Sequence, residues 1–132
     1  MFLLSLQAEL ASGWFRLIVS MKITKQMKIH IEQATPDKAS HIASLIMEAM
    51  TPSCCQNFAG PRHTLVDFHQ MMERLVRMED SQYSFRNTLV ATNSEGIVMG
   101  ILVAYDGGKL KELRQRFIQE AIVSFGIDYS GM

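Results

Sequence analysis

Cysteine is scarce in this chain of 132 residues: there are only two, and they are adjacent, at Cys54 and Cys55. Neighbouring cysteines cannot bridge without a strained ring, so a disulfide framework is excluded and a reducing compartment is expected, with the cytoplasm as the default location. Net charge is also lacking, since 13 basic residues balance 13 acidic ones. Without an excess of positive charge or a Lys/Arg cluster, binding of nucleic acid through bulk charge is disfavoured.

The sequence also lacks an uncharged hydrophobic run long enough to span a membrane. Its most apolar segment, residues 1–20, is interrupted by Glu9 and Arg16 and has no basic start of the kind that secretory signals carry. Leucines at helical spacing allow an amphipathic helix packed on the domain, and a membrane-surface anchor is a further interpretation. Because a strand pattern begins near Met27, we interpret residues 1–26 as a leader or accessory helix, or as the product of a mis-assigned start.

Residues 27–132 carry strand and helix patterns in an orderly succession. Alternating or continuous apolar residues predict strands over 28–32, 87–92 and 97–105. Apolar residues three and four apart predict helices over 35–49, 64–80 and 110–125. Two prolines and a glycine predict a loop over residues 51–63, and Gly126 is expected to close the last helix. The order strand, helix, helix, strand, strand, helix indicates an α+β fold.

Motifs for metal binding and nucleophilic catalysis are weak. Cys54 and Cys55 have no spacer, and His63 and His69 are six residues apart, whereas zinc ligands usually follow C-x₂₋₄-C and H-x₃₋₅-H spacing. The thiols also lack a recognisable Cys–His signature. We therefore predict no metal site and assign no catalytic residue.

Charged residues on the predicted helices are interpreted as solvated. Glu73 and Arg77 are four residues apart, which predicts an exposed ion pair on the second helix. The last helix carries a basic face for which phosphate binding is the alternative interpretation; its residues are Lys109, Lys111, Arg114 and Arg116.

Three stretches of the domain together resemble one protein family. Residues 31–39 (IEQATPDKA), followed by helical apolar residues, are similar to the Ile-Arg-x-Ala-Thr-x-x-Asp stretch that joins the first strand to the first helix in the GNAT family of N-acetyltransferases. Residues 89–91 (LVA), with the turn and strand at 93–100 (NSEGIVMG), resemble its second and third strands. The chain departs from the pattern in having Glu32 and Lys38 where the family usually has Arg and Asp. The resemblance covers residues 28–105 well and the remainder loosely.

The resemblance implies transfer of an acetyl group from acetyl-CoA to an amine acceptor. In that family acetyl-CoA is held by an Arg/Gln-x-x-Gly-x-Gly/Ala loop after the fourth strand, and no such stretch occurs in this sequence. The expected fold is therefore the N-terminal half of an acyl-CoA N-acyltransferase, a mixed, largely antiparallel sheet without the cofactor-binding strands. We assign no cofactor-binding residue and expect the chain to be inactive alone.

The resemblance also places residues 51–63 on the acceptor side, with Phe58 and His63 as the expected wall residues; the acceptor itself stays open. The strand at 97–105 would be left with an open edge, so the chain is expected to oligomerise or to be marginally stable. One alternative is a small α+β interaction module or dimerising subunit that pairs through this edge. Another is a split enzyme whose missing C-terminal half is a separate polypeptide.

Overall fold

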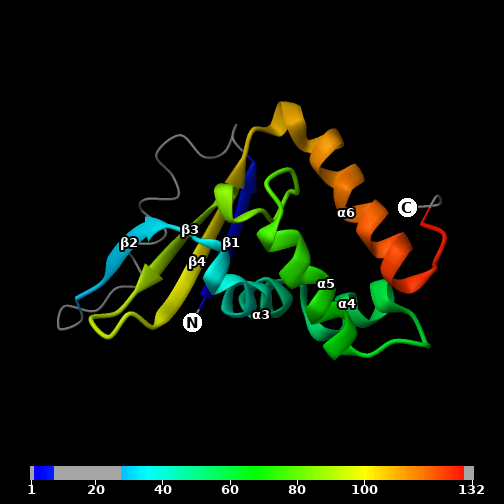
Figure 1. Cartoon of the computed structure of the whole chain (residues 1–132), viewed down its shortest axis with the longest axis horizontal. Coiled ribbons are helices and arrows are strands. Elements are labelled where there is room, and N and C mark those ends of the chain that lie inside the picture. The colour runs from blue at the N-terminus through cyan, green and yellow to red at the C-terminus, as the bar shows by residue number, and fades with distance from the viewer. Residues whose placement is uncertain (1, 8–27, 130–132) are drawn as a thin grey trace.

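The chain has an α+β fold, seen in a computed structural model that describes residues 2–7 and 28–129 (Figure 1). Four strands and four α-helices lie within these residues, together with three short 3₁₀ turns. The strands are β1 (Phe2–Gln7), β2 (His30–Gln33), β3 (Thr88–Thr92) and β4 (Val98–Tyr105). The helices are α3 (Ala39–Met50), α4 (Pro52–Ala59), α5 (Leu65–Arg77) and α6 (Leu110–Phe125). The α+β class predicted from the order of the patterns is confirmed.

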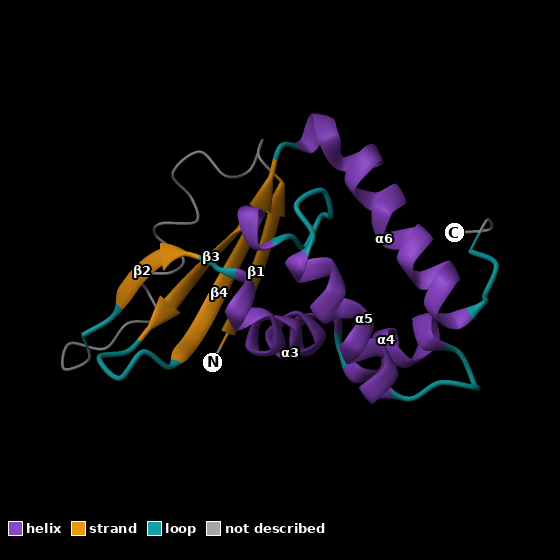
Figure 2. Ribbon diagram, viewed as in Figure 1, coloured by secondary structure: helices purple, strands orange, loops and turns teal. Residues whose placement is uncertain are grey.

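The strands form one sheet in the order β1-β4-β3-β2 (Figure 2). β2 pairs antiparallel with β3, and β3 pairs antiparallel with β4, across the turn at Asn93. β1 runs parallel to β4 on its other side. The sheet is thus mixed and largely antiparallel, as expected.

β1 overturns two expectations. Residues 2–7 form a strand and not part of a helix, while residue 1 and residues 8–26 of the proposed leader lie outside the described residues. A short apolar run fits either element, and pairing with a free strand edge satisfies its backbone groups. Because β1 pairs along residues 100–105, the edge of β4 is not open, and the expected association through it loses its basis.

The helices form a second layer that extends beyond the sheet. Figure 1 shows α3 lying against the strands, α5 beside α3, and α6 turning away from the end of β4 to reach α4 and α5. Val90, Ile101 and Val103 point from the sheet into the same apolar core as the helices. In this arrangement α3 contacts both the sheet and the helices α4 and α5.

The segment 51–63 is not the loop that its prolines and glycine predicted. Helix α4 occupies most of it, and the expected breakers mark its boundaries. The Thr51 hydroxyl accepts a hydrogen bond from the Cys54 amide at 3.3 Å, and Pro52 takes the first helical position, where no amide is needed. Gly60 ends the helix with a φ of 80°, a conformation that glycine adopts without steric cost.

The first long helix also begins later than predicted. A 3₁₀ turn, Pro36–Lys38, precedes α3, and the Thr35 hydroxyl bonds the Asp37 carboxylate in place of a backbone amide. Two of the other helix ends agree with the sequence patterns: α5 begins with a capping box, and α6 ends at Gly126 in the left-handed conformation.

Candidate functional site

Phe58, expected to line an acceptor site, lies in a cluster of aromatic rings. Its ring centroid is 5.3 Å from that of Phe117 in an edge-on contact, 6.4 Å from Phe68 and 5.7 Å from Tyr129. The Tyr129 hydroxyl also donates a hydrogen bond of 2.6 Å to the Phe58 carbonyl. Phe58 therefore joins α4 to α5, to α6 and to the segment that follows α6.

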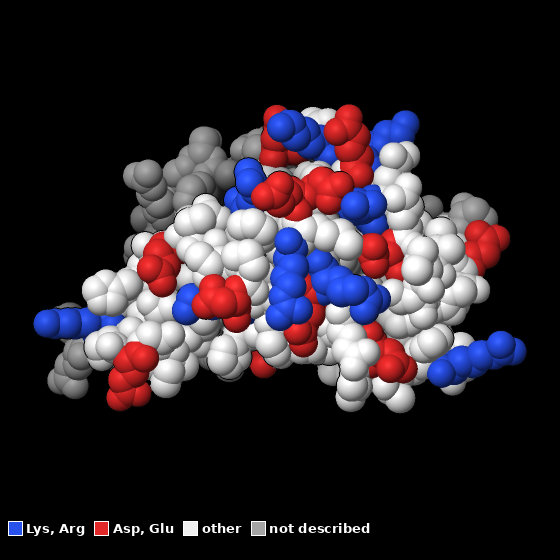
Figure 3. All heavy atoms as spheres, viewed as in Figure 1, with Lys and Arg blue, Asp and Glu red and all other residues white. Residues whose placement is uncertain are grey.

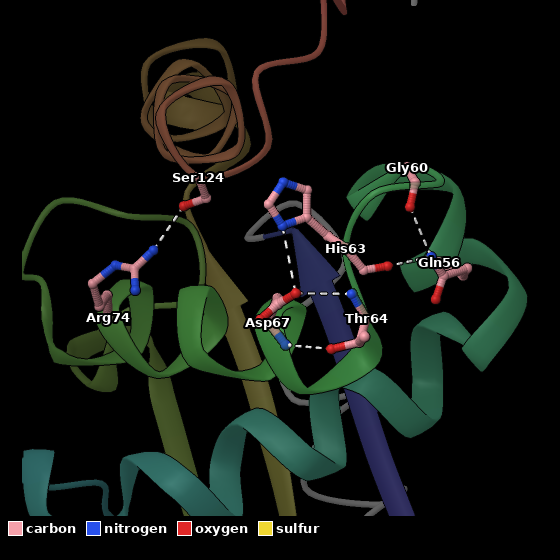
Figure 4. Close-up of polar contacts among 7 residues, drawn as sticks. All are labelled: Gln56, Gly60, His63, Thr64, Asp67, Arg74 and Ser124. Carbon is pink, nitrogen blue, oxygen red and sulfur yellow. Dashed lines mark hydrogen bonds and ion pairs between the residues drawn. The ribbon is translucent and has the colours of Figure 1, made fainter.

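His63, the second expected wall residue, lies in the turn between α4 and α5 (Figure 4). Its ring packs 5.1 Å from that of Phe125, and its Nδ1 is 3.4 Å from a carboxylate oxygen of Asp67. The Gln56 side chain braces the turn by donating to the carbonyls of Gly60 and His63, at 2.9 and 2.8 Å. His63 is thus half-buried and held in place by the helices on both sides.

Asp67, the partner of His63, is the first-turn acid of α5. Its carboxylate accepts a 2.9 Å hydrogen bond from the Thr64 amide, while the Thr64 hydroxyl accepts one from the Asp67 amide (Figure 4). The Thr64 amide, and to a lesser degree the Thr64 hydroxyl and His63, hold the pKa of this carboxyl below its ordinary value. Thr64 and Asp67 therefore form the cap of α5, and His63 lies beside this cap.

Loss of this cap in acid gives a testable prediction. A carboxyl whose folded pKa is lowered stabilises the fold above its unfolded pKa, about 3.9, and the stabilisation disappears as pH falls through the lower folded value. We expect Asp67→Asn to melt below the wild type at pH 7 and the two melting temperatures to converge as the pH falls below about 4. Circular dichroism melts across this range measure it, and a constant difference would contradict the assignment.

A groove opens where α3, the start of α4 and the start of α5 meet. Its volume is about 520 Å³, which lies within the usual range for small-molecule sites. Phe58 and His63 do not line this groove. The sequence patterns did not predict that the residues lining it would come together. The lining residues are Ser44, Met47, Glu48, Pro52, Leu65, Val66 and His69.

At one end of this groove, Ser44, His69 and Glu73 lie in the order of a nucleophile, base and acid. His69 Nε2 is 3.0 Å from the Ser44 hydroxyl, and Nδ1 is 3.0 Å from the Glu73 carboxylate. However, the Ser40 carbonyl lies 3.1 Å from Nε2 and also accepts a 3.2 Å hydrogen bond from the Ser44 hydroxyl. The Ser44 hydroxyl is therefore held by the backbone of its own helix, and the cluster ties α5 to α3.

The predicted ion pair between Glu73 and Arg77 is confirmed, at 3.5 Å. The Glu73 carboxylate also lies 3.0 Å from His69 Nδ1, so it contacts both Arg77 and His69. These contacts lie within α5.

The two cysteines differ in their surroundings. Cys55 is fully buried, its thiol faces the Met47 carbonyl at 3.8 Å, and burial raises its pKa to about 11. Cys54 is partly exposed. Residues 28–129 contain no group of three His, Cys, Asp or Glu side chains arranged to hold a metal ion.

This difference predicts selective thiol labelling. Since only an exposed thiolate reacts readily, one equivalent of a chromogenic disulfide reagent should react with the native chain and two with the chain in guanidinium. Cys54→Ala should abolish the native reaction and leave one thiol after unfolding. Two native equivalents, or a fast native reaction of Cys54→Ala, would show that Cys55 is accessible.

Charge on the molecule is mixed in sign. Figure 3 shows basic and acidic side chains interspersed on the face in view, in keeping with the zero formal net charge. No helix in the described part of the chain is both long and apolar enough to cross a membrane.

Comparisons with known proteins give no relative. No protein-family model, no curated protein and no solved structure matches this chain. Its function is therefore inferred from the order of its strands and from the residues they bring together.

Proposed function

We propose that residues 28–105 form the first part of a GNAT-type N-acetyltransferase domain, which transfers an acetyl group from acetyl-CoA to an amine. The observation that carries the proposal is the register of three strands. Ile31, from the first resembling stretch, pairs with Ala91, from the second, and Ala91 pairs with Gly100, from the third. All three stretches of the resemblance thus meet in one line across adjoining antiparallel strands.

The helices support the same proposal. In the resembling family two helices connect the first strand to the second, and here α3, α4 and α5 connect β2 to its antiparallel neighbour β3. α4 is an additional short helix in this connection. The outer edge of β4, where the family has its fourth strand, is occupied by β1. A complete domain of this kind would need the fourth strand to take the place of residues 2–7.

Acetyl-CoA binding would depend on residues that this sequence does not contain. Backbone amides of a glycine-containing loop at a helix N-terminus are the groups suited to a pyrophosphate, and the Arg/Gln-x-x-Gly-x-Gly/Ala loop is absent. We therefore propose acetyl-CoA as the cofactor of the whole domain and assign no residue of this chain to its binding or to catalysis.

Calorimetry with acetyl-CoA tests the proposal. The ligand is titrated into the 132-residue chain and into a longer protein that continues through the reading frame after codon 132. Binding by the longer protein alone supports the proposal. Micromolar binding by the 132-residue chain would overturn the account of the missing loop and direct the search to residues 97–116. Failure of a folded longer protein to bind would overturn the acetyltransferase assignment.

A further inference from the structure

We infer that the groove between α3 and α5 binds a small organic cation, a monoammonium ion with an apolar body. The inference rests on the groove itself. If the chain also belongs to an acetyltransferase domain, as proposed above, this organic cation represents the class of its amine acceptor.

The walls of the groove favour an apolar body. Met47 on α3, Pro52 at the start of α4, and Leu65 and Val66 at the start of α5 line the groove together. Val66 is 67% exposed, a large exposed fraction for a valine on a helix whose other face is fully buried. Methionine adapts its shape to irregular ligands, so these walls suit an aryl or branched alkyl group better than a polar one.

One charge is available to such a ligand, and it is negative. Glu48 lines the groove from the last turn of α3, one helical step from Ser44 and beside Met47. Within the described part of the chain its carboxylate makes no ion pair and no side-chain hydrogen bond. The last turn of α3 contains no basic residue, although the carbonyl end of a helix favours a cation.

The other ionisable residue of the groove does not neutralise Glu48. His69 directs Nδ1 to Glu73 and Nε2 to the Ser40 carbonyl and the Ser44 hydroxyl. Both of its ring nitrogens are therefore engaged by residues of α3 and α5. A bound cation would therefore meet an unpaired carboxylate, and a bound anion would be repelled by it.

The backbone beside Glu48 is held in an unusual conformation. Thr51 has a φ of 75° and a ψ of 148°, and it is the only described residue other than glycine with a positive φ. Such backbone typically costs about 1–3 kcal/mol and is concentrated at functional sites. Here it turns the chain sharply from α3 into α4, which brings Pro52 to the groove beside Met47 and Glu48.

Nuclear magnetic resonance of the ¹⁵N-labelled 132-residue chain tests the inference, with 2-phenylethylammonium as the probe. We expect saturable amide shifts confined to the end of α3 and the starts of α4 and α5. The matched anion, 3-phenylpropionate, should cause no saturable shift there, and the neutral 2-phenylethanol should bind roughly threefold to fivefold more weakly, since an exposed ion pair contributes up to about 1 kcal/mol. Ethylammonium, which keeps the charge without the apolar body, should bind more weakly than the aryl probe.

Two matched variants assign the charge. Glu48→Gln keeps an exposed side chain of the same size, and its spectrum reports at once whether the fold is retained; we expect roughly fivefold weaker binding. Glu95→Gln changes an exposed acid in the turn before β4 and should bind as the wild type does. Equal binding by wild type and Glu48→Gln, equal binding of the anion, or no saturable shift at the groove would each overturn the inference. Acetyl-CoA is absent from this experiment, so its failure leaves the proposed acetyl transfer to be judged by calorimetry.

Discussion

Replacing Phe68 with alanine is expected to lower the free energy of unfolding by about 3–5 kcal/mol, the usual loss for a fully buried phenylalanine. Phe68 is completely buried in α5, and its ring stacks on that of Phe125 at 6.0 Å with 7° between the ring planes. It also lies 6.4 Å from the ring of Phe58. Alanine would remove a side chain that contacts aromatic rings of both α4 and α6, and it would leave a cavity where they meet. Urea unfolding followed by circular dichroism measures the loss.

Val66→Ala is the matched control, because it removes apolar atoms two residues earlier on the same helix. Val66 is 67% exposed, so its loss should change the free energy of unfolding by no more than about 0.5 kcal/mol. If Phe68→Ala cost less than about 1 kcal/mol, or if the two variants were equally destabilised, the aromatic cluster would not be the core of the helical layer.

Elements with local sequence signals could be predicted. The helix expected over 64–80 is α5, and the helix closed by Gly126 is α6, since apolar periodicity and a left-handed glycine are properties of the segment itself. The β3–β4 hairpin follows from its turn: the Asn93 side chain accepts hydrogen bonds from the amides of Glu95 and Ile97, as asparagine commonly does in turns.

Elements defined by distant partners could not be predicted. The pattern of residues 2–7 is equally compatible with a helix, and their pairing with residues 100–105 joins segments that are far apart in the sequence. The prolines and the glycine in residues 51–63 suggested a loop because both residue types disrupt the interior of a helix. However, proline is favoured at the first position of a helix and glycine just after its end, which is where Pro52 and Gly60 lie. The prolines and the glycine therefore indicated where α4 begins and ends, but they did not show that the residues between them are helical.

The groove was missed for a related reason. Ser44 and His69 are separated by 25 positions, and nothing in the sequence indicates that α3 and α5 bring them together. The sequence alone does not distinguish Glu48 from other exposed acids. Only the structure shows that it lines a groove and has no ion-pair partner in the described part of the chain. Phe58, by contrast, was expected at an acceptor site because the family resemblance placed residues 51–63 there, and its contacts with three aromatic rings could not be predicted from the sequence.

The position of Phe58 leads to a second prediction with a large effect. Phe58→Ala should lower the free energy of unfolding by about 2–3 kcal/mol, less than for Phe68 because Phe58 is only partly buried. Phe117→Ala, at a position that is 4% exposed on α6, should cost about 3 kcal/mol or more. The two rings meet edge-on at 5.3 Å and 89°, so their effects should not be independent.

A double-mutant cycle separates a core contact from an acceptor wall. If Phe58 attaches α6 to α4, the double variant should lose about 0.5–1.5 kcal/mol less than the two single losses together, the usual coupling of an aromatic pair. Ile122→Ala, on the same helix at a position that is 45% exposed, replaces Phe117→Ala in the control cycle and should show no coupling to Phe58. A ring that lined an acceptor site would instead give a Phe58→Ala chain of nearly unchanged stability with no coupling to Phe117, and that result would return Phe58 to the list of candidate binding residues.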